Sequence, residues 1–135
     1  MTISECKLVD LPGSADDRGK LAFVEPPSTI PFEIRRVYYL FDIPSGKERG
    51  AHGHRDLQQL MIAVSGSFSV VLDDGKECKT FRLSKPDQGL YISKMIWRDL
   101  KDFSEDAVCL VLASERYAED DYFRSYDEFY REATP

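Results

Sequence analysis

The sequence predicts an all-β protein, an antiparallel barrel or sandwich that ends in one short helix. From Arg35 onward, seven short runs rich in Val, Ile, Leu, Tyr and Phe are separated by turn residues, which fits a sandwich or small barrel. Asp74-Gly75 is a strong hairpin signal, because a tight type I′ turn requires positive φ. Phe68, Val70 and Leu72 occupy every second position of one run, the period of a strand with one buried face.

The seven expected strands lie, in chain order, at residues 35–43, 58–66, 68–74, 77–83, 89–93, 95–100 and 107–114. An eighth run, residues 19–25, is isolated by Pro26, Pro27 and Pro31. Such an outlying strand could complete a neighbouring sheet, including the sheet of a second subunit. Near the C-terminus, aromatic residues at 3–4-residue spacing predict a helix over about residues 120–132, which caps the barrel or packs on a partner.

Composition limits the class of protein. A chain of 135 residues is most simply one domain, residues 1–135, and its net charge of −6 argues against nucleic acid or an anionic membrane as a partner. Cys6, Cys78 and Cys109 are odd in number and widely spaced, as expected for reduced thiols. Neither a secretory signal nor an apolar stretch of the ~20 residues that span a bilayer is present. We therefore expect a cytoplasmic protein.

Both histidines of the chain stand one residue apart, at His52 and His54. Together with Gly46, Gln59 and Gly66 they have the spacing of the first cupin motif, in which a glutamate normally stands at the position of Gln59. In the segment that resembles the second motif, "YISKMIWRDL", Arg98 stands where a third histidine ligand is expected. An amide and a permanent cation are poor substitutes for metal ligands, so the sequence predicts no metal.

Without a metal, the two histidines are candidates for acid/base catalysis. Alternate residues of a strand point to the same side, so His52 and His54 are expected to face one cavity, with ordinary pKa values near ~6.5. The alternative is that one of them only forms a hydrogen bond with the backbone of the barrel wall.

The order of motifs across most of the chain resembles the sugar-nucleotide 3,4-ketoisomerases of the WxcM-like family, which are small cupin proteins. The resemblance rests on "DDRGKLAFVE", "PFEIRRVYYLFDIP", "ERGAHGHRDLQQ", "GSFSVVLDDG", "GLYISKMIWRDLKDFS" and "CLVLASERYAEDDYFRSYDEF". It implies a cupin jelly roll that forms a homodimer. Residues 19–25 would be an element that the two subunits exchange.

The resemblance also implies an activity without metal or cofactor. The substrate would be a dTDP-4-keto-6-deoxyhexose, whose carbonyl moves from C4 to C3 to give the substrate of a 3-aminotransferase. The catalytic residues would be His52 and His54, and the family usually has the second histidine as the base.

Moving a carbonyl from C4 to C3 requires removal of the C3 proton, an enediolate, and protonation at C4. We expect His54 to be the base at C3, with His52 or a tyrosine polarising the carbonyl or relaying the proton. Donors are needed close to the enediolate oxygens, and the candidates are Tyr39, the other imidazole in its protonated form, and Arg98.

The diphosphate of the substrate requires cations, and arginine is suited to bidentate phosphate recognition. Trp97 or Tyr91 is a candidate for stacking on the thymine, and Gln59 is a further candidate for substrate binding. The available arginines are Arg18, Arg35, Arg36, Arg49 and Arg98, of which Arg18 and Arg49 match the "RG" positions of the family.

Three other functions remain open at this stage. A 3,5-epimerase would use the same proton abstraction but leave the carbonyl in place. A non-catalytic cupin would bind the sugar nucleotide without turnover, and a metal-dependent cupin would require stoichiometric metal in spite of Gln59 and Arg98.

Overall fold

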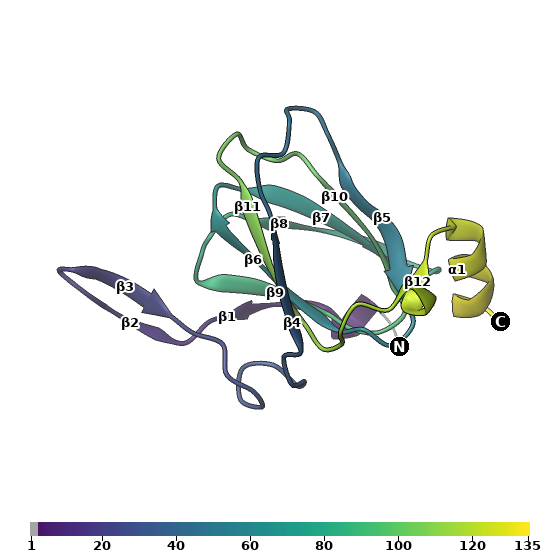
Figure 1. The fold of residues 1–135 in the computed structure, drawn as a ribbon, viewed down its shortest axis with the longest axis horizontal. Helices are drawn as coiled ribbons and strands as arrows, with labels where there is room; N and C mark the ends of the chain where they lie inside the picture. The colour runs from purple at the N-terminus through teal and green to yellow at the C-terminus, as the bar shows by residue number, and fades with distance from the viewer. Residues whose placement is uncertain (1–2) are drawn as a thin grey trace.

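The computed structural model describes residues 3–135, which form two five-stranded sheets packed face to face, a protruding hairpin and a C-terminal helix (Figure 1). The predicted all-β jelly-roll class is confirmed, and the described strands pair antiparallel. The first sheet has the order β1 (Lys7–Asp10), β9 (Gln88–Ile92), β6 (Gln59–Ser65), β11 (Val108–Ala113) and β4 (Arg36–Leu40). The second has the order β12 (Tyr122–Phe123), β5 (Arg49–His54), β10 (Ile96–Lys101), β7 (Phe68–Asp73) and β8 (Cys78–Leu83).

The main core lies between the two sheets. Phe68, Val70 and Leu72 of β7 are fully buried there, as their alternation predicts. They pack with apolar residues from the facing sheet, which include Met61, Leu90, Ile92, Cys109 and Val111.

The hairpin predicted at Asp74-Gly75 joins β7 to β8. Gly75 has a φ of +93°, a conformation that favours glycine. The Asp74 carboxylate accepts hydrogen bonds from the backbone N–H groups of Lys76 and Glu77, both at 2.8 Å, and of Ile3 at 2.9 Å. This side chain therefore fixes the turn and also holds the start of the chain, where the short 3₁₀ helix η1 (Ile3–Glu5) lies.

The proline-rich segment, residues 26–32, covers the outer face of the first sheet. Ile30 and Phe32 are buried there in a second apolar cluster with Leu60, Ile62 and Leu112. The segment thus packs on the barrel. It also separates the two strands that directly precede it from both five-stranded sheets.

Those strands form a separate hairpin, β2 (Gly13–Asp16) and β3 (Gly19–Ala22), which projects away from the barrel (Figure 1). The strand expected over residues 19–25 is found at Gly19–Ala22. Every residue of both strands is exposed, and the side chains of Leu21 and Phe23 are exposed although they are apolar. The hairpin therefore has no core of its own in a single chain.

The C-terminal helix is shorter than predicted. The helix α1 covers Tyr126–Ala133, and the expected first turn is replaced by the 3₁₀ helix η2 (Glu119–Asp121) and by β12. The prediction failed there because Tyr122 and Phe123 pair with His54 and Gly53 of β5. Ser125 caps the helix, since its side chain accepts a hydrogen bond from the backbone N–H of Glu128. No helix within residues 3–135 has the length and hydrophobicity needed to span a membrane.

One aromatic side chain anchors this helix to the barrel. Phe129 is fully buried, and its ring lies 5.9 Å from the ring of Trp97 and 5.7 Å from that of Phe123.

Replacing Phe129 by Ala is expected to lower the free energy of unfolding by about 3–5 kcal/mol, measured by urea denaturation. The matched control is Tyr130→Ala on the exposed face of the same helix, where a change within about 0.5 kcal/mol is expected. Equal losses in the two variants would contradict this role for Phe129.

Candidate active site

Residues from both sheets meet in a small cavity inside the barrel, next to the edge strand β4. The cavity has a volume of about 60 Å³. Tyr38 and Leu40 line it from β4, Arg49 and His52 from β5, and Arg98 from β10.

Strand register brings the first histidine and the buried arginine to the same side of the sheet. His52 lies opposite Arg98 in the pairing of β5 with β10, and His54 lies opposite Ile96. Gly53 and Trp97 alternate with them and face the other way. The pairing shifts by one residue just before His52, at Ala51, which has a φ of +57°. This β-bulge contributes to the orientation of the strand at the histidines.

Arg98 is the largest fully buried side chain, with 1% of its surface exposed. Its guanidinium donates to the side-chain carbonyl of Gln59 and, at 2.8 Å, to the backbone carbonyl of Ile96. The amide nitrogen of Gln59 donates in turn to the hydroxyl of Tyr38 at 2.9 Å. The two positions that would supply further ligands in the cupin motif therefore bind each other.

The residues present do not fit a metal ion. A guanidinium is a permanent cation and repels a second one, and the neutral Gln59 is already held by Arg98. Within residues 3–135, no group of three or more His, Cys, Asp or Glu side chains is placed to hold a metal.

His54 lies deep in the site, with 1% of its side chain exposed. Its Nδ1 atom is 3.0 Å from Oδ2 of Asp121, in η2. The other ring nitrogen, Nε2, is buried and has no hydrogen-bond partner among residues 3–135. His52 is half-buried, with its ring centre 4.9 Å from that of His54, and the Tyr122 ring lies 4.3 Å from the His54 ring.

Both histidines are neutral at neutral pH, in contrast to the ordinary pKa values and the protonated imidazole donor expected from the sequence. Burial and the nearby charge of Arg98 lower the pKa of His52 to about 4. The same two causes, burial first, place the pKa of His54 below its usual range. Burial raises the pKa of Tyr38, so its hydroxyl remains a donor.

Further cationic and aromatic groups lie close to the histidines. The Arg36 guanidinium lies 5.2 Å from the ring centre of Tyr38 and 5.7 Å from that of Tyr117. Its Nε atom is buried without a partner in the part of the chain that the structure describes. Arg124 covers the ring of Tyr122 at 3.9 Å and pairs with Glu119.

Two expected site residues, Tyr39 and Trp97, do not line this cavity. Tyr39 is 59% exposed on the outer side of β4 beside Phe41, because its neighbour Tyr38 occupies the inward position. Trp97 is 8% exposed and packs against Tyr126 and Phe129 on the far side of β10, so it cannot stack on a ligand in the cavity.

The remaining candidates differ in their positions. Tyr91, on the outer side of the first sheet, packs with Phe32. Arg36 lies over the ring of Tyr38 and its charge acts on His54, and Arg49 lines the cavity, so both remain close to the histidines. Arg18 lies on the hairpin between β2 and β3, with 86% of its side chain exposed, and pairs with Asp16. A single chain therefore does not bring Arg18 to the site.

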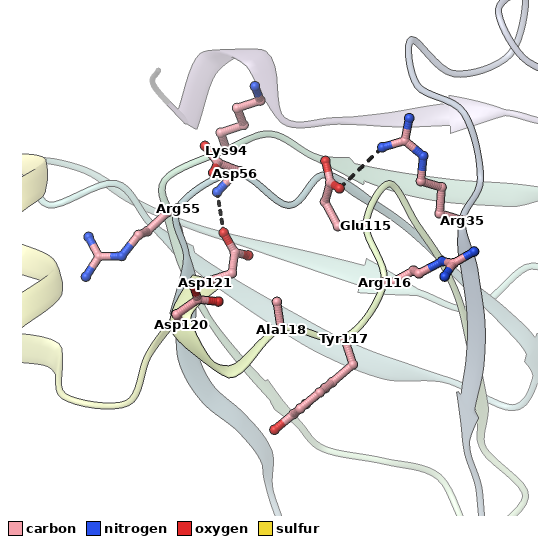
Figure 2. Close-up of a pocket in the computed structure, with 10 residues that line it drawn as sticks. All are labelled: Arg35, Arg55, Asp56, Lys94, Glu115, Arg116, Tyr117, Ala118, Asp120 and Asp121. Carbon is pink, nitrogen blue, oxygen red and sulfur yellow. Dashed lines mark hydrogen bonds and ion pairs between the residues drawn. The ribbon is translucent and has the colours of Figure 1, made fainter.

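A larger cavity of about 640 Å³ lies on the other side of the segment that carries η2 (Figure 2). Arg35, Arg55, Lys94 and Arg116 line it together with carboxylates, among them Glu115, which pairs with Arg35 at 3.3 Å. Asp121 also lies in its wall, so this carboxylate stands between the cavity and His54.

Sequence reasoning missed Tyr38, Asp121 and Tyr122. The alternation along β4 could have identified Tyr38 if its inward face had been known. No local signal marks Asp121, because it reaches His54 through a contact between residues 67 positions apart.

Comparison with known proteins gives consistent matches over the whole fold. Residues 4–134 match the family described as FdtA, WxcM-like, C-terminal. A curated relative, the TDP-4-oxo-6-deoxy-alpha-D-glucose-3,4-oxoisomerase of Aneurinibacillus thermoaerophilus, is 42% identical over 125 residues, which cover 93% of this chain and 90% of the relative.

Solved structures agree with this match. The TDP-quinovose 3,4-ketoisomerase WlaRB of Campylobacter jejuni is 47% identical with a TM-score of 0.91, and the match covers 96% of this chain and 99% of that one. A mutant of the 3,4-ketoisomerase QdtA from Thermoanaerobacterium thermosaccharolyticum, solved in complex with TDP-4-keto-6-deoxyglucose, is 39% identical with a TM-score of 0.93. That match covers 98% of this chain and 96% of the QdtA chain.

The charge of Arg98 predicts how the histidines titrate. In Arg98→Met the pKa of His52 is expected to rise above about 4 while staying below ~6.5, because burial still lowers it. The pKa of His54 should rise in the same direction. Titration of the two imidazoles by NMR measures both values. Arg98→Lys retains a cation and is the control, and unchanged pKa values in Arg98→Met would show that its charge does not act on the histidines.

Proposed function

The chain belongs to the WxcM-like family, and on that premise we propose that it is a sugar-nucleotide 3,4-ketoisomerase. It converts a dTDP-4-keto-6-deoxyhexose into the 3-keto isomer, which a 3-aminotransferase then consumes. The observation that carries the proposal is the neutral pair His52 and His54 beside the buried cation Arg98. The pair can accept and return a proton, and the cation favours a negative charge formed next to it.

The reaction moves two protons between neighbouring carbons and oxygens. A base removes the proton from C3 of the 4-keto sugar, and the electrons pass to O4 to form an enediolate. O4 is protonated, O3 loses its proton, and C4 receives a proton to leave the carbonyl at C3. A base at C3, an acid at C4, a proton donor at O4 and a proton acceptor at O3 are therefore required, with donors that stabilise the enediolate charge.

The difference in burial between the two histidines divides their roles. The sequence favours His54 as the base at C3, but Nε2 of His54 is buried, whereas His52 is half-buried and lines the cavity. A sugar in the cavity would meet His52 first. We therefore assign the removal of the C3 proton to His52, and a supporting acid/base role to His54 behind it.

Arg98 and Tyr38 are the proposed donors to the enediolate. The same positive charge that lowers the pKa of His52 stabilises an anion in the cavity, so the weak base is offset by a stabilised intermediate. Tyr38 lines the same cavity, and its raised pKa keeps the hydroxyl protonated. Gln59 holds both donors in place through its amide.

Arg36 and Arg49 are the proposed contacts of the diphosphate within one chain, because Arg49 lines the cavity and Arg36 lies over the ring of Tyr38, which also lines it. The exposed thiol of Cys78 remains free, and we propose a reducing, cytoplasmic location for the enzyme.

We also propose a homodimer in which the β2–β3 hairpin reaches a second copy. Apolar side chains are exposed both on the hairpin region, at Leu21 and Phe23, and on the outer side of β4 and beyond it, at Val37 and Phe41. A partner that covers these surfaces would remove them from water. In such a dimer, Arg18 is available to the diphosphate in the partner's site.

The activity is tested by incubating the protein with dTDP-4-keto-6-deoxyglucose in deuterated water and following the sugar by NMR. The expected product carries its carbonyl at C3. Replacing His52 by Asn is expected to lower the rate by about 10²–10⁴-fold and to stop deuterium exchange at C3, whereas exchange in His54→Asn remains detectable. The reverse pattern would make His54 the base. A carbonyl that stays at C4 with exchange at C3 and C5 would indicate an epimerase, and binding without change would indicate a non-catalytic cupin.

The position of Arg18 predicts complementation between two defective chains. Arg18→Ala retains the histidines, and His52→Asn retains Arg18, so a mixed dimer contains one complete site if Arg18 acts on the partner. Random mixing of equal amounts should then restore about a quarter of wild-type activity. Gel filtration with light scattering verifies that dimers form. Activity no greater than the mean of the two separate variants would contradict the exchange.

A further inference from the structure

Asp121 is the anionic side chain in contact with the buried histidine. Its Oδ2 atom lies 3.0 Å from Nδ1 of His54, and 13% of its side chain is exposed. It comes from η2, on the segment between the barrel interior and the charged cavity, and Figure 2 shows it in the wall of that cavity. We propose that Asp121 is a positioning residue, which keeps the proton of neutral His54 on Nδ1 and leaves the lone pair of Nε2 free for proton transfer.

This inference rests on the proposed function, because it gives His54 an acid/base role. The geometry does not depend on it. A carboxylate only accepts hydrogen bonds, so the contact with Oδ2 requires that Nδ1 carries the proton. Nε2 must then be the unprotonated nitrogen of the neutral ring, and it is also the one without a partner among the described residues.

The carboxylate is held in place by the backbone at the end of β5. Its Oδ1 atom accepts a hydrogen bond from the backbone N–H of Asp56 at 2.7 Å, which Figure 2 marks with a dashed line. The backbone N–H of Leu57 also favours the charged form of this carboxylate, because it lowers the pKa. Because the two oxygens serve different donors, the side chain has little freedom to turn away from His54.

The charges around His54 explain why an anion is needed there. Arg98 from β10, Arg36 from β4 and Arg124 beyond β12 all disfavour a proton on this ring, and His52 does so when it is itself protonated. A proton accepted at Nε2 would place an imidazolium among these cations. Asp121 on the opposite side of the ring stabilises that charge, which favours transient protonation.

Asp121 is itself influenced by its surroundings. Burial raises its pKa, and Asp56 and Glu115 act in the same direction, whereas the backbone donors at residues 56 and 57 lower it. The backbone donors therefore oppose part of the rise in the pKa of Asp121 that burial causes.

The fixed donors predict what an amide at this position would do. In Asp121→Asn the side-chain oxygen remains with the backbone N–H of Asp56, so the NH₂ group must point to Nδ1 of His54. Nδ1 then becomes an acceptor, and the proton of the neutral ring moves to Nε2. The variant therefore keeps the shape of the site but presents a protonated Nε2 to the interior.

Nitrogen NMR of the imidazoles tests the inference directly. In the wild-type protein, His54 is expected to show a protonated Nδ1 and an unprotonated Nε2, and Asp121→Asn should reverse the two signals. Asp121→Glu keeps an anion and should retain the wild-type pattern. Asp120→Asn removes a neighbouring carboxylate that lines the same cavity without contacting His54, and it should leave the pattern unchanged.

Kinetics with the 4-keto sugar nucleotide gives the second readout. Asp121→Asn is expected to lower kcat by at least about 100-fold, with KM changed by less than about threefold, because the defect lies in proton transfer and not in binding. Asp121→Glu should recover part of kcat. A wild-type protein without isomerase activity would overturn the proposed function, while the tautomer measurement would still decide the position of the proton. An unchanged tautomer in Asp121→Asn would overturn the role of Asp121.

Discussion

The hydrogen bond between the Arg98 guanidinium and the neutral carbonyl of Gln59 is the interaction on which the site depends. A fully buried cation normally pairs with an anion, and here its partner is an amide. The positive charge is therefore not neutralised by the side chain that holds it. It acts on the histidines, on Tyr38 and on anything that enters the cavity. Metal binding is disfavoured at the same position, since the guanidinium is a permanent cation that already binds Gln59.

Groups of opposite charge act on the two histidines. Arg98 lies opposite His52 in the strand pairing, and Asp121 contacts His54, so a cation and an anion both act on the imidazole pair. In this arrangement the histidines rest in their neutral forms, and a proton that reaches His54 has a counter-ion. The histidines come from β5, Arg98 from β10 and Asp121 from η2, so the barrel rather than any single motif determines the chemistry.

The sequence predicted the parts of this arrangement that follow from local patterns. The strands from β4 onward, the hairpin at Asp74 and the histidines on one strand face all come from residue spacing and turn chemistry. The inward face of β4 could not be determined that way, because Tyr38 and Tyr39 are equivalent until the sheet packs. The side of β10 on which Trp97 packs could not be determined for the same reason, and β2 lacks the apolar alternation of a strand. Asp121 depends on β12 pairing with β5, which overrides a helical pattern of aromatic residues.

The β-bulge at Ala51 also determines which residues share the cavity. In a regular strand, Arg49 and His52 would point to opposite sides, because they are three positions apart. The inserted residue restores the alignment, so that Arg49 lies opposite Leu100 and His52 lies opposite Arg98, all facing inward. The chain thus places a residue suited to phosphate and a residue suited to proton transfer on one surface at an odd spacing. A chain of the same length with a regular strand here would keep both histidines in place and turn Arg49 to the other side of the sheet.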